Sequence, residues 1–112
     1  MTFEFPETEE YLLKLDAYEL SSVVLALYHE VMERVLWSLD KGSWFRQRPF
    51  DEAQRVVNGI VSAYQKAFVL IQEKVTLDPD YMETFTIGEE QWRFLDKITT
   101  ADSWDEVPFG KG

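Results

Sequence analysis

The stretch DEAQRVVNGIVSAYQKAFVLIQEKV (residues 51–75) carries the most regular hydrophobic pattern in the chain. Its apolar residues recur at steps of three and four, which places them on one side of an α-helix. Flanking apolar residues widen this arc to about half of the helix circumference. The pattern predicts a helix over residues 52–75 that packs against two neighbours. The central stripe consists of Ala53, Val57, Ile60, Tyr64, Ala67, Ile71 and Val75.

Asp51 and Gln54 predict how this helix begins. A side-chain oxygen at Asp51 can accept a hydrogen bond from the first turn, and Gln54 has the spacing of a capping box. Gly59 lies on the polar side of the same helix. Because glycine costs about 1 kcal/mol relative to alanine inside a helix, a kink or a close approach of another segment is expected there.

A second long helix is predicted over residues 17–41. Asp16 and Glu19 form a capping pair before it, and Gly42 supplies a stop after it. A short loop joins the two long helices, so they should lie antiparallel as a hairpin. One face of the earlier helix is apolar at helical spacing, through Leu20, Val24, Leu27, Tyr28, Val31, Val35 and Leu39.

Shorter helices are expected at both ends of this hairpin. The acidic stretch 7–15 predicts one before it, and the step Asp78–Pro79 opens another after it, with proline in the favoured first position. Thr86 and Glu89 resemble a further capping pair, for a helix that ends near Thr99. The expected fold class is therefore an all-α, small helical bundle that forms a single domain over residues 1–112.

The final residues 100–112 have no sustained periodicity. They alternate acidic and aromatic residues, a composition found in docking tails. Alternatively, Trp104 and Phe109 tuck onto the bundle and complete its core. We favour packing, because a small bundle gains from such closure.

Charge is distributed in three blocks. Residues 1–40 hold nine acids and two bases, residues 41–75 hold three acids and six bases, and residues 76–112 hold nine acids and three bases. The net charge is −10, which disfavours general binding to nucleic acid. The chain has no cysteine, no segment that resembles a signal peptide, and no apolar run long enough for a membrane span. We therefore expect a cytoplasmic protein.

Catalytic side chains are few. His29 is the sole histidine, and its i,i+4 spacing to Glu33 could begin a metal site with Glu30. An ordinary contact on a solvated helix face is the simpler interpretation. No nucleophile elbow or phosphate-binding glycine loop is present. The sequence therefore predicts a protein without enzymatic activity, cofactor or metal, and a metal-dependent enzyme remains a minor alternative.

The loop KGSWFRQRPF (residues 41–50) mixes basic and aromatic residues. Trp44, Phe45, Arg46 and Arg48 could anchor a protein partner, because tryptophan and arginine are enriched at interface hot spots. The same mixture could stack bases and hold phosphates of RNA. The structural alternative is that the aromatic residues close the end of the bundle while the arginines pair with the acidic ends.

Trp37 is the second unusual aromatic residue. The helical pattern places it toward the polar sector, near Glu30 and Glu33. It is either covered by the first short helix or exposed as an anchor with an acidic rim, which suits a basic partner surface.

These features favour an acidic helical module that binds a protein partner with a basic surface. Inhibitors, immunity proteins, antitoxins and phage-encoded blockers are of this physical type, and occlusion with electrostatic steering would be the mechanism. The alternative from another class is a structural or accessory subunit that forms a homodimer, because the apolar arcs of the long helices could exceed what one chain covers. An RNA-binding accessory protein is less favoured.

Overall fold

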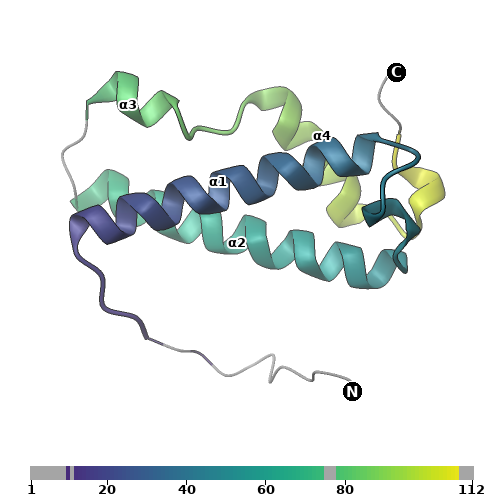
Figure 1. The fold of residues 1–112 in the computed structure, drawn as a ribbon, viewed down its shortest axis with the longest axis horizontal. Coiled ribbons are helices and arrows are strands. Elements are labelled where there is room, and N and C mark those ends of the chain that lie inside the picture. Colours follow the sequence, from purple (N-terminus) through teal and green to yellow (C-terminus); the bar gives the residue numbers. More distant parts are fainter. Residues whose placement is uncertain (1–9, 11, 75–77, 109–112) are drawn as a thin grey trace.

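The computed structural model describes residues 10, 12–74 and 78–108, and all regular secondary structure in this part of the chain is helical. The fold is a small all-α bundle, as the sequence predicts (Figure 1). Its elements are α1 (Ala17–Leu39), the 3-10 turn η1 (Phe45–Gln47), α2 (Phe50–Lys74), α3 (Pro79–Glu83), α4 (Glu89–Thr100) and the 3-10 turn η2 (Trp104–Glu106).

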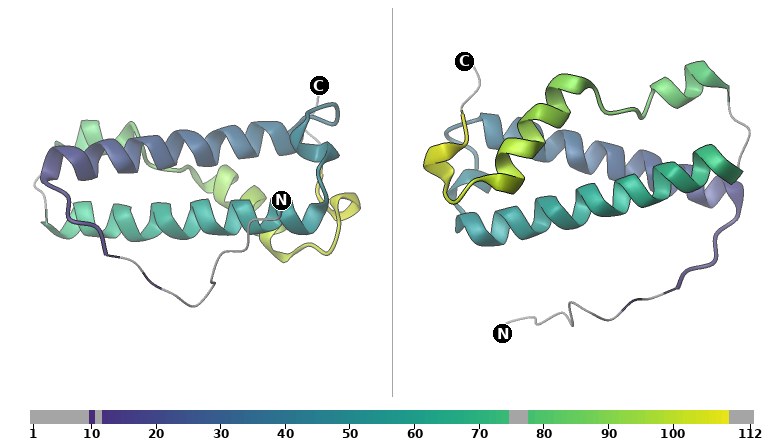
Figure 2. Two further views of the ribbon diagram at one scale, coloured as in Figure 1. Left: turned by 60° about the horizontal axis from the view of Figure 1, so that its bottom comes forward. Right: turned by 180° about the vertical axis from the view of Figure 1, so that it is seen from behind.

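The two long helices α1 and α2 run antiparallel and form the most extensive contact between any two elements (Figure 1). This arrangement confirms the predicted hairpin. Helices α3 and α4 lie on one side of the hairpin, where α4 contacts both long helices (Figure 2). The turn η2 lies at the end of the hairpin where α1 connects to α2 (Figure 1).

Helix α1 begins at the predicted capping box. The backbone N–H of Glu19 donates to Asp16 Oδ1 over 2.8 Å, and the backbone N–H of Asp16 donates to Glu19 Oε1 over 3.0 Å. The helix ends at Leu39, two residues before the predicted end, and Asp40 then accepts a hydrogen bond from the backbone of Gly42. Local side-chain chemistry therefore sets both ends of α1.

The predicted short helix over residues 7–15 is wrong where the structure can test it. Residues 12–15 lie outside any helix, and residues 1–9 and 11 lie outside the described part of the chain. The physical reason is the capping box, because an N-cap residue adopts non-helical angles. Asp16 is extended, with φ −80° and ψ 177°, so the preceding segment leaves the helix axis.

The predicted N-terminal cap of α2 is also wrong. This helix begins at Phe50, before Asp51, and the side chain of Gln54 points to α4 instead of its own first turn. Gln54 Nε2 lies within hydrogen-bond distance of three carbonyl oxygens at the end of α4, those of Ile98, Thr99 and Ala101, at 3.0, 3.2 and 2.9 Å. A tertiary contact has replaced the local one, because the last carbonyls of a helix have no partner within it.

Only some of the predicted ends of α3 and α4 agree with the structure. Asp78 caps α3, and Pro79 occupies its first turn, as predicted. The predicted Thr86 cap of α4 is wrong, because Gly88 occupies the N-cap position. The hydroxyl of Thr86 instead donates to the carbonyl oxygen of Met82 over 2.7 Å, so it belongs to the end of α3.

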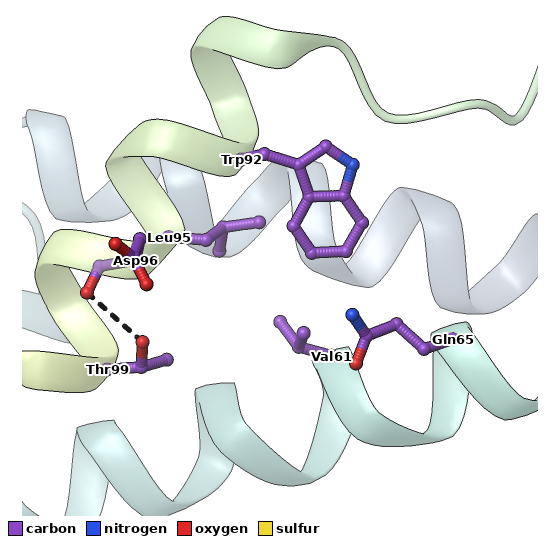
Figure 3. Close-up of a pocket in the computed structure, with 6 residues that line it drawn as sticks. All are labelled: Val61, Gln65, Trp92, Leu95, Asp96 and Thr99. Atoms are coloured by element: carbon purple, nitrogen blue, oxygen red, sulfur yellow. Dashed lines mark hydrogen bonds between the residues drawn. The ribbon is translucent and has the colours of Figure 1, made fainter.

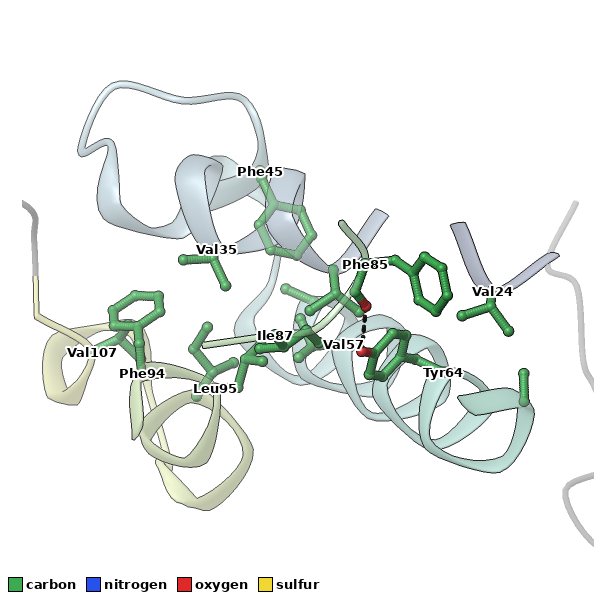
Figure 4. Packing of buried hydrophobic residues seen from close by; sticks show 14 of the residues in the cluster. Val24, Val35, Phe45, Val57, Tyr64, Phe85, Ile87, Phe94, Leu95 and Val107 are labelled. Atoms are coloured by element: carbon green, nitrogen blue, oxygen red, sulfur yellow. Dashed lines mark hydrogen bonds between the residues drawn. The ribbon is translucent and has the colours of Figure 1, made fainter. Parts of the chain in front are cut away.

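The hydrophobic core lies between α1, α2 and the segment that leads into α4 (Figure 4). The predicted stripes face inward, as Val24 and Val31 of α1 and Val57 and Ile71 of α2 show, each at most 1 % exposed. The core also contains Phe85, which is 0 % exposed and comes from the non-helical link between α3 and α4. Periodicity could not predict this residue, because it belongs to no long helix.

Gly59 marks neither a kink nor a close approach. Helix α2 is continuous from Phe50 to Lys74, and a Cβ atom added at Gly59 would meet no heavy atom within 4 Å. The expectation of a special backbone role is therefore wrong, because this side of α2 faces solvent.

Candidate functional site

The loop that joins α1 and α2 has a buried side and an exposed side. Phe45 is 0 % exposed and closes the end of the hairpin, where its ring centroid lies 5.8 Å from that of Trp104. Trp44, the preceding residue, is 53 % exposed. The predicted aromatic plug is therefore formed by Phe45, and Trp44 remains accessible.

Arg46 is buried and connects three parts of the chain. Its Nη1 donates to the carbonyl oxygen of Ser38 over 2.6 Å, and its Nη2 lies 2.8 Å from that of Trp104 and 3.2 Å from that of Val107. Burial lowers the pKa of the guanidinium, and the nearby charge of Asp105 opposes this shift. Arg46 therefore holds the end of α1 against the C-terminal segment and is not exposed to a partner or to RNA in this conformation.

The C-terminal segment packs on the bundle as far as it is described. Trp104 Nε1 donates to the carbonyl oxygen of Arg48 over 2.9 Å, and the Trp104 ring lies 5.1 Å from that of Phe50. Val107 is 2 % exposed. This placement agrees with the packed alternative for residues up to 108, and Phe109 lies outside the described residues.

The exposed side of the hairpin end combines apolar and acidic groups. Leu36 is 62 % exposed, and the half-buried ring of Trp37 lies 5.0 Å from that of Trp44. Glu33 precedes them on the same helix and is exposed. We call this area the Trp37–Trp44 surface, which comprises Glu30, Glu33, Leu36, Trp37, Trp44 and Arg48.

Arg48 lies at the edge of this surface. Its guanidinium is 5.9 Å from the ring centroid of Trp44, and its Nη2 lies 3.9 Å from a carboxylate oxygen of Glu52. The side chain of Arg48 is 41 % exposed and that of Glu52 is 56 % exposed, so this ion pair is weak in water. Among the four loop residues predicted to bind a partner, Trp44 and Arg48 are thus exposed, whereas Phe45 and Arg46 are buried.

Arg34 packs beneath this surface, a role that the helical periodicity of α1 does not predict. Its guanidinium lies 4.7 Å from the ring centroid of Trp37 and 5.4 Å from that of Phe45, and its Nη2 lies 3.3 Å from Glu30. Only 15 % of its side chain is exposed. Stacking on a cation restricts the orientation of Trp37. The i,i+4 spacing to Glu30 and i,i+3 spacing to Trp37 was the available signal.

Within the described part of the chain, two pockets lie away from the Trp37–Trp44 surface. One of about 200 Å³ lies between α2 and α4 (Figure 3). The other, of about 370 Å³, lies at the start of α1, where Leu13, Leu20 and Leu70 contribute apolar walls. The described residues contain no group of three His, Asp or Glu side chains that could hold a metal ion, and His29 is exposed on α1.

Comparison with protein-family models, with curated proteins and with solved structures gives no match. In the described part of the chain, no helix combines the length and the apolarity needed to cross a lipid bilayer.

Proposed function

We propose that this chain is a non-enzymatic binding protein that uses the Trp37–Trp44 surface to dock on a basic surface of a protein partner. The observation that supports the proposal most strongly is the position of Trp44, a half-exposed indole packed against Trp37 of α1, the helix that also carries Glu30 and Glu33. Tryptophan side chains of this kind supply much of the binding energy at protein interfaces, and a polar rim shields them from water.

Electrostatics would bring the partner to this surface. The chain carries a net charge of −10, and a field of one sign accelerates the encounter with a partner of opposite charge. Glu33 adds an exposed negative charge on α1, whereas the charge of Glu30 is largely balanced by Arg34 at 3.3 Å. Occlusion of a basic site is the mechanism that follows, and inhibitors, immunity proteins, antitoxins and phage-encoded blockers work in this way. A chain without cysteine suits such a role in the reducing cytoplasm.

Phe45 and Arg46 have a supporting role in this proposal. The buried side chains of Phe45 and Arg46 fix the conformation of the loop. Arg34 of α1 packs against the ring of Trp37 and restricts its orientation. A surface held in place before binding loses less conformational entropy when the complex forms.

Affinity capture with two matched variants tests the proposal. Immobilised protein is incubated with an extract of the source cells, and the retained proteins are identified and then purified for binding measurements. Trp44→Ser should abolish retention of the partner, whereas Val69→Ser should leave it unchanged, because Val69 is similarly exposed at 49 % but lies on α2. Equal loss in both variants, or a partner without a basic surface, would contradict the proposal.

A homodimer is the second candidate, and one observation favours it. Leu13 is 78 % exposed and Leu70 is 47 % exposed beside the 370 Å³ pocket, and a contiguous apolar patch of this kind is typical of an interface. Sedimentation equilibrium should then show a dimer in the wild-type protein and a monomer in Leu70→Ser. A wild-type monomer at about 100 µM would exclude a dimer of useful affinity.

A further inference from the structure

The pocket between α2 and α4 has an apolar base and one aromatic wall. Val61 and Leu95 form the base, and the six-membered ring of Trp92 points from α4 toward α2 (Figure 3). The pocket measures about 200 Å³. Sites for drug-sized ligands usually span about 300–1,000 Å³, so this pocket suits a single side chain better than a cofactor.

The polar groups of the pocket are the carboxylate of Asp96, the amide of Gln65, the hydroxyl of Thr99 and the indole N–H of Trp92. The carboxylate of Asp96 has neither a hydrogen bond nor an ion pair within the described residues, and Arg93 on the same helix bonds to Glu89 over 2.7 Å. The amide of Gln65 is likewise available. The hydroxyl of Thr99 donates to the backbone oxygen of Asp96 and keeps its lone pairs free to accept.

We propose that this pocket receives an arginine side chain from the surface of a protein partner. A planar guanidinium can stack on the indole of Trp92 and donate hydrogen bonds to Asp96 and Gln65 at its edge. The net charge of −10 favours the approach of such a side chain. This inference specifies a chemistry for the basic partner and rests on the proposed function for the existence of that partner.

Other occupants fit the pocket less well. An anion would be repelled by the carboxylate of Asp96. A purely apolar side chain would exclude water from that carboxylate without offering a hydrogen bond, which is costly. Lysine could pair with Asp96, but its compact ammonium cannot stack as a plane on Trp92 or bond two acceptors in the fork geometry of a guanidinium.

NMR titration with a blocked amino acid tests the inference directly. The probe is Nα-acetyl-L-arginine methylamide, and the readouts are the indole N–H of Trp92, the side-chain amide of Gln65 and the backbone amides of α4. We expect saturable shifts at these groups with a dissociation constant in the millimolar range, which is typical of one isolated side chain. The blocked lysine derivative should bind more weakly, and the blocked citrulline derivative, which is neutral and nearly isosteric, should give no saturable shift.

Asp96→Asn should weaken binding of the arginine probe about fivefold, the size expected for one partly exposed ion pair. The variant should fold normally, because Thr99 and Thr100 bond to the backbone oxygen of residue 96 and not to its carboxylate. Glu73→Gln is the matched control, since Glu73 is an exposed acid on α2 outside the pocket, and it should bind the probe like the wild type.

Equal shifts with arginine and citrulline derivatives, an unchanged affinity in Asp96→Asn, or shifts confined to the Trp37–Trp44 surface would overturn the inference. Its failure is distinguishable from failure of the proposed function. A captured partner that still requires Trp44 would leave the proposed function intact when the probe does not bind. If the probe binds but no basic partner is captured, the arginine preference of the pocket is supported and the proposed function is contradicted.

Discussion

Single buried polar side chains join segments of this bundle that lie far apart in the sequence. Arg46 closes the end near the hairpin loop with hydrogen bonds to backbone carbonyls from α1 and from the C-terminal segment. Tyr64 joins the middle of α2 to the link before α4, because its hydroxyl donates to the carbonyl oxygen of Phe85 over 2.6 Å (Figure 4). Buried groups of this kind cost little when satisfied and much when one partner is removed.

Arg46→Met should therefore lower the free energy of unfolding by roughly 2–4 kcal/mol, because it leaves buried carbonyl oxygens without a donor. Arg48→Met is the matched control, since its side chain is 41 % exposed, and it should cost less than about 1 kcal/mol. Urea denaturation of both variants measures the difference. Equal losses in the two variants would show that Arg46 has no special structural role.

The buried phenol of Tyr64 should make the free energy of unfolding depend on pH. Burial raises the pKa of its phenol above the ordinary value of 10.0. A group whose folded-state pKa is raised contributes stability that is fully present below the unfolded pKa and is lost as pH rises through the folded pKa. The wild type should thus lose more stability than Tyr64→Phe between pH values of about 8 and 11. Urea denaturation at several pH values measures this, and parallel losses in both proteins would contradict it.

Elements that carry a strong period were predictable from their own residues. The apolar stripe of α2 and the capping box of α1 both depend on residues spaced within about one helical turn. Such spacings can be read directly from the sequence. Contacts between elements were not predictable in the same way. Gln54 has the spacing of a local cap, yet it serves the end of α4, and Phe85 enters the core from a segment without periodicity.

The contact between Gln54 and α4 should matter for the stability of that helix. Gln54→Glu removes the donor and sets a carboxylate against the negative end of the α4 dipole, so it should cost about 2 kcal/mol. Asn58→Asp, which adds a charge at an exposed position in the middle of the same helix, should change stability by less than about 0.5 kcal/mol. Hydrogen exchange should show lower protection of α4 amides in the first variant alone. Unchanged α4 protection would mean that Gln54 does not hold this helix end.

Gly59 offers a gain in stability within α2. Because a methyl group at this position meets nothing within 4 Å, Gly59→Ala should raise the free energy of unfolding by about 0.5–1 kcal/mol through lower entropy of the unfolded chain. Thermal unfolding measures the change. A loss of stability would show that α2 needs glycine there.

At the scale of the whole molecule, exposed apolar side chains are present at both ends of the hairpin. The hairpin end presents exposed Trp44 and Leu36, and the opposite end presents Leu13 and Leu70. The sequence placed Trp37, Glu30 and Glu33 together because all three belong to one helix. It could not distinguish the buried Phe45 and Arg46 from the exposed Trp44 and Arg48, because loop geometry depends on the C-terminal segment that packs against it.

The association rate of the captured partner with this protein tests the central claim most directly. Stopped-flow fluorescence of the tryptophans would follow binding as salt is raised from about 20 mM to about 150 mM, a range over which the screening length shortens markedly. The association rate should fall by about tenfold or more, because opposite charges steer the encounter. A rate that stays constant over this range would contradict the recognition of a basic surface by this acidic protein.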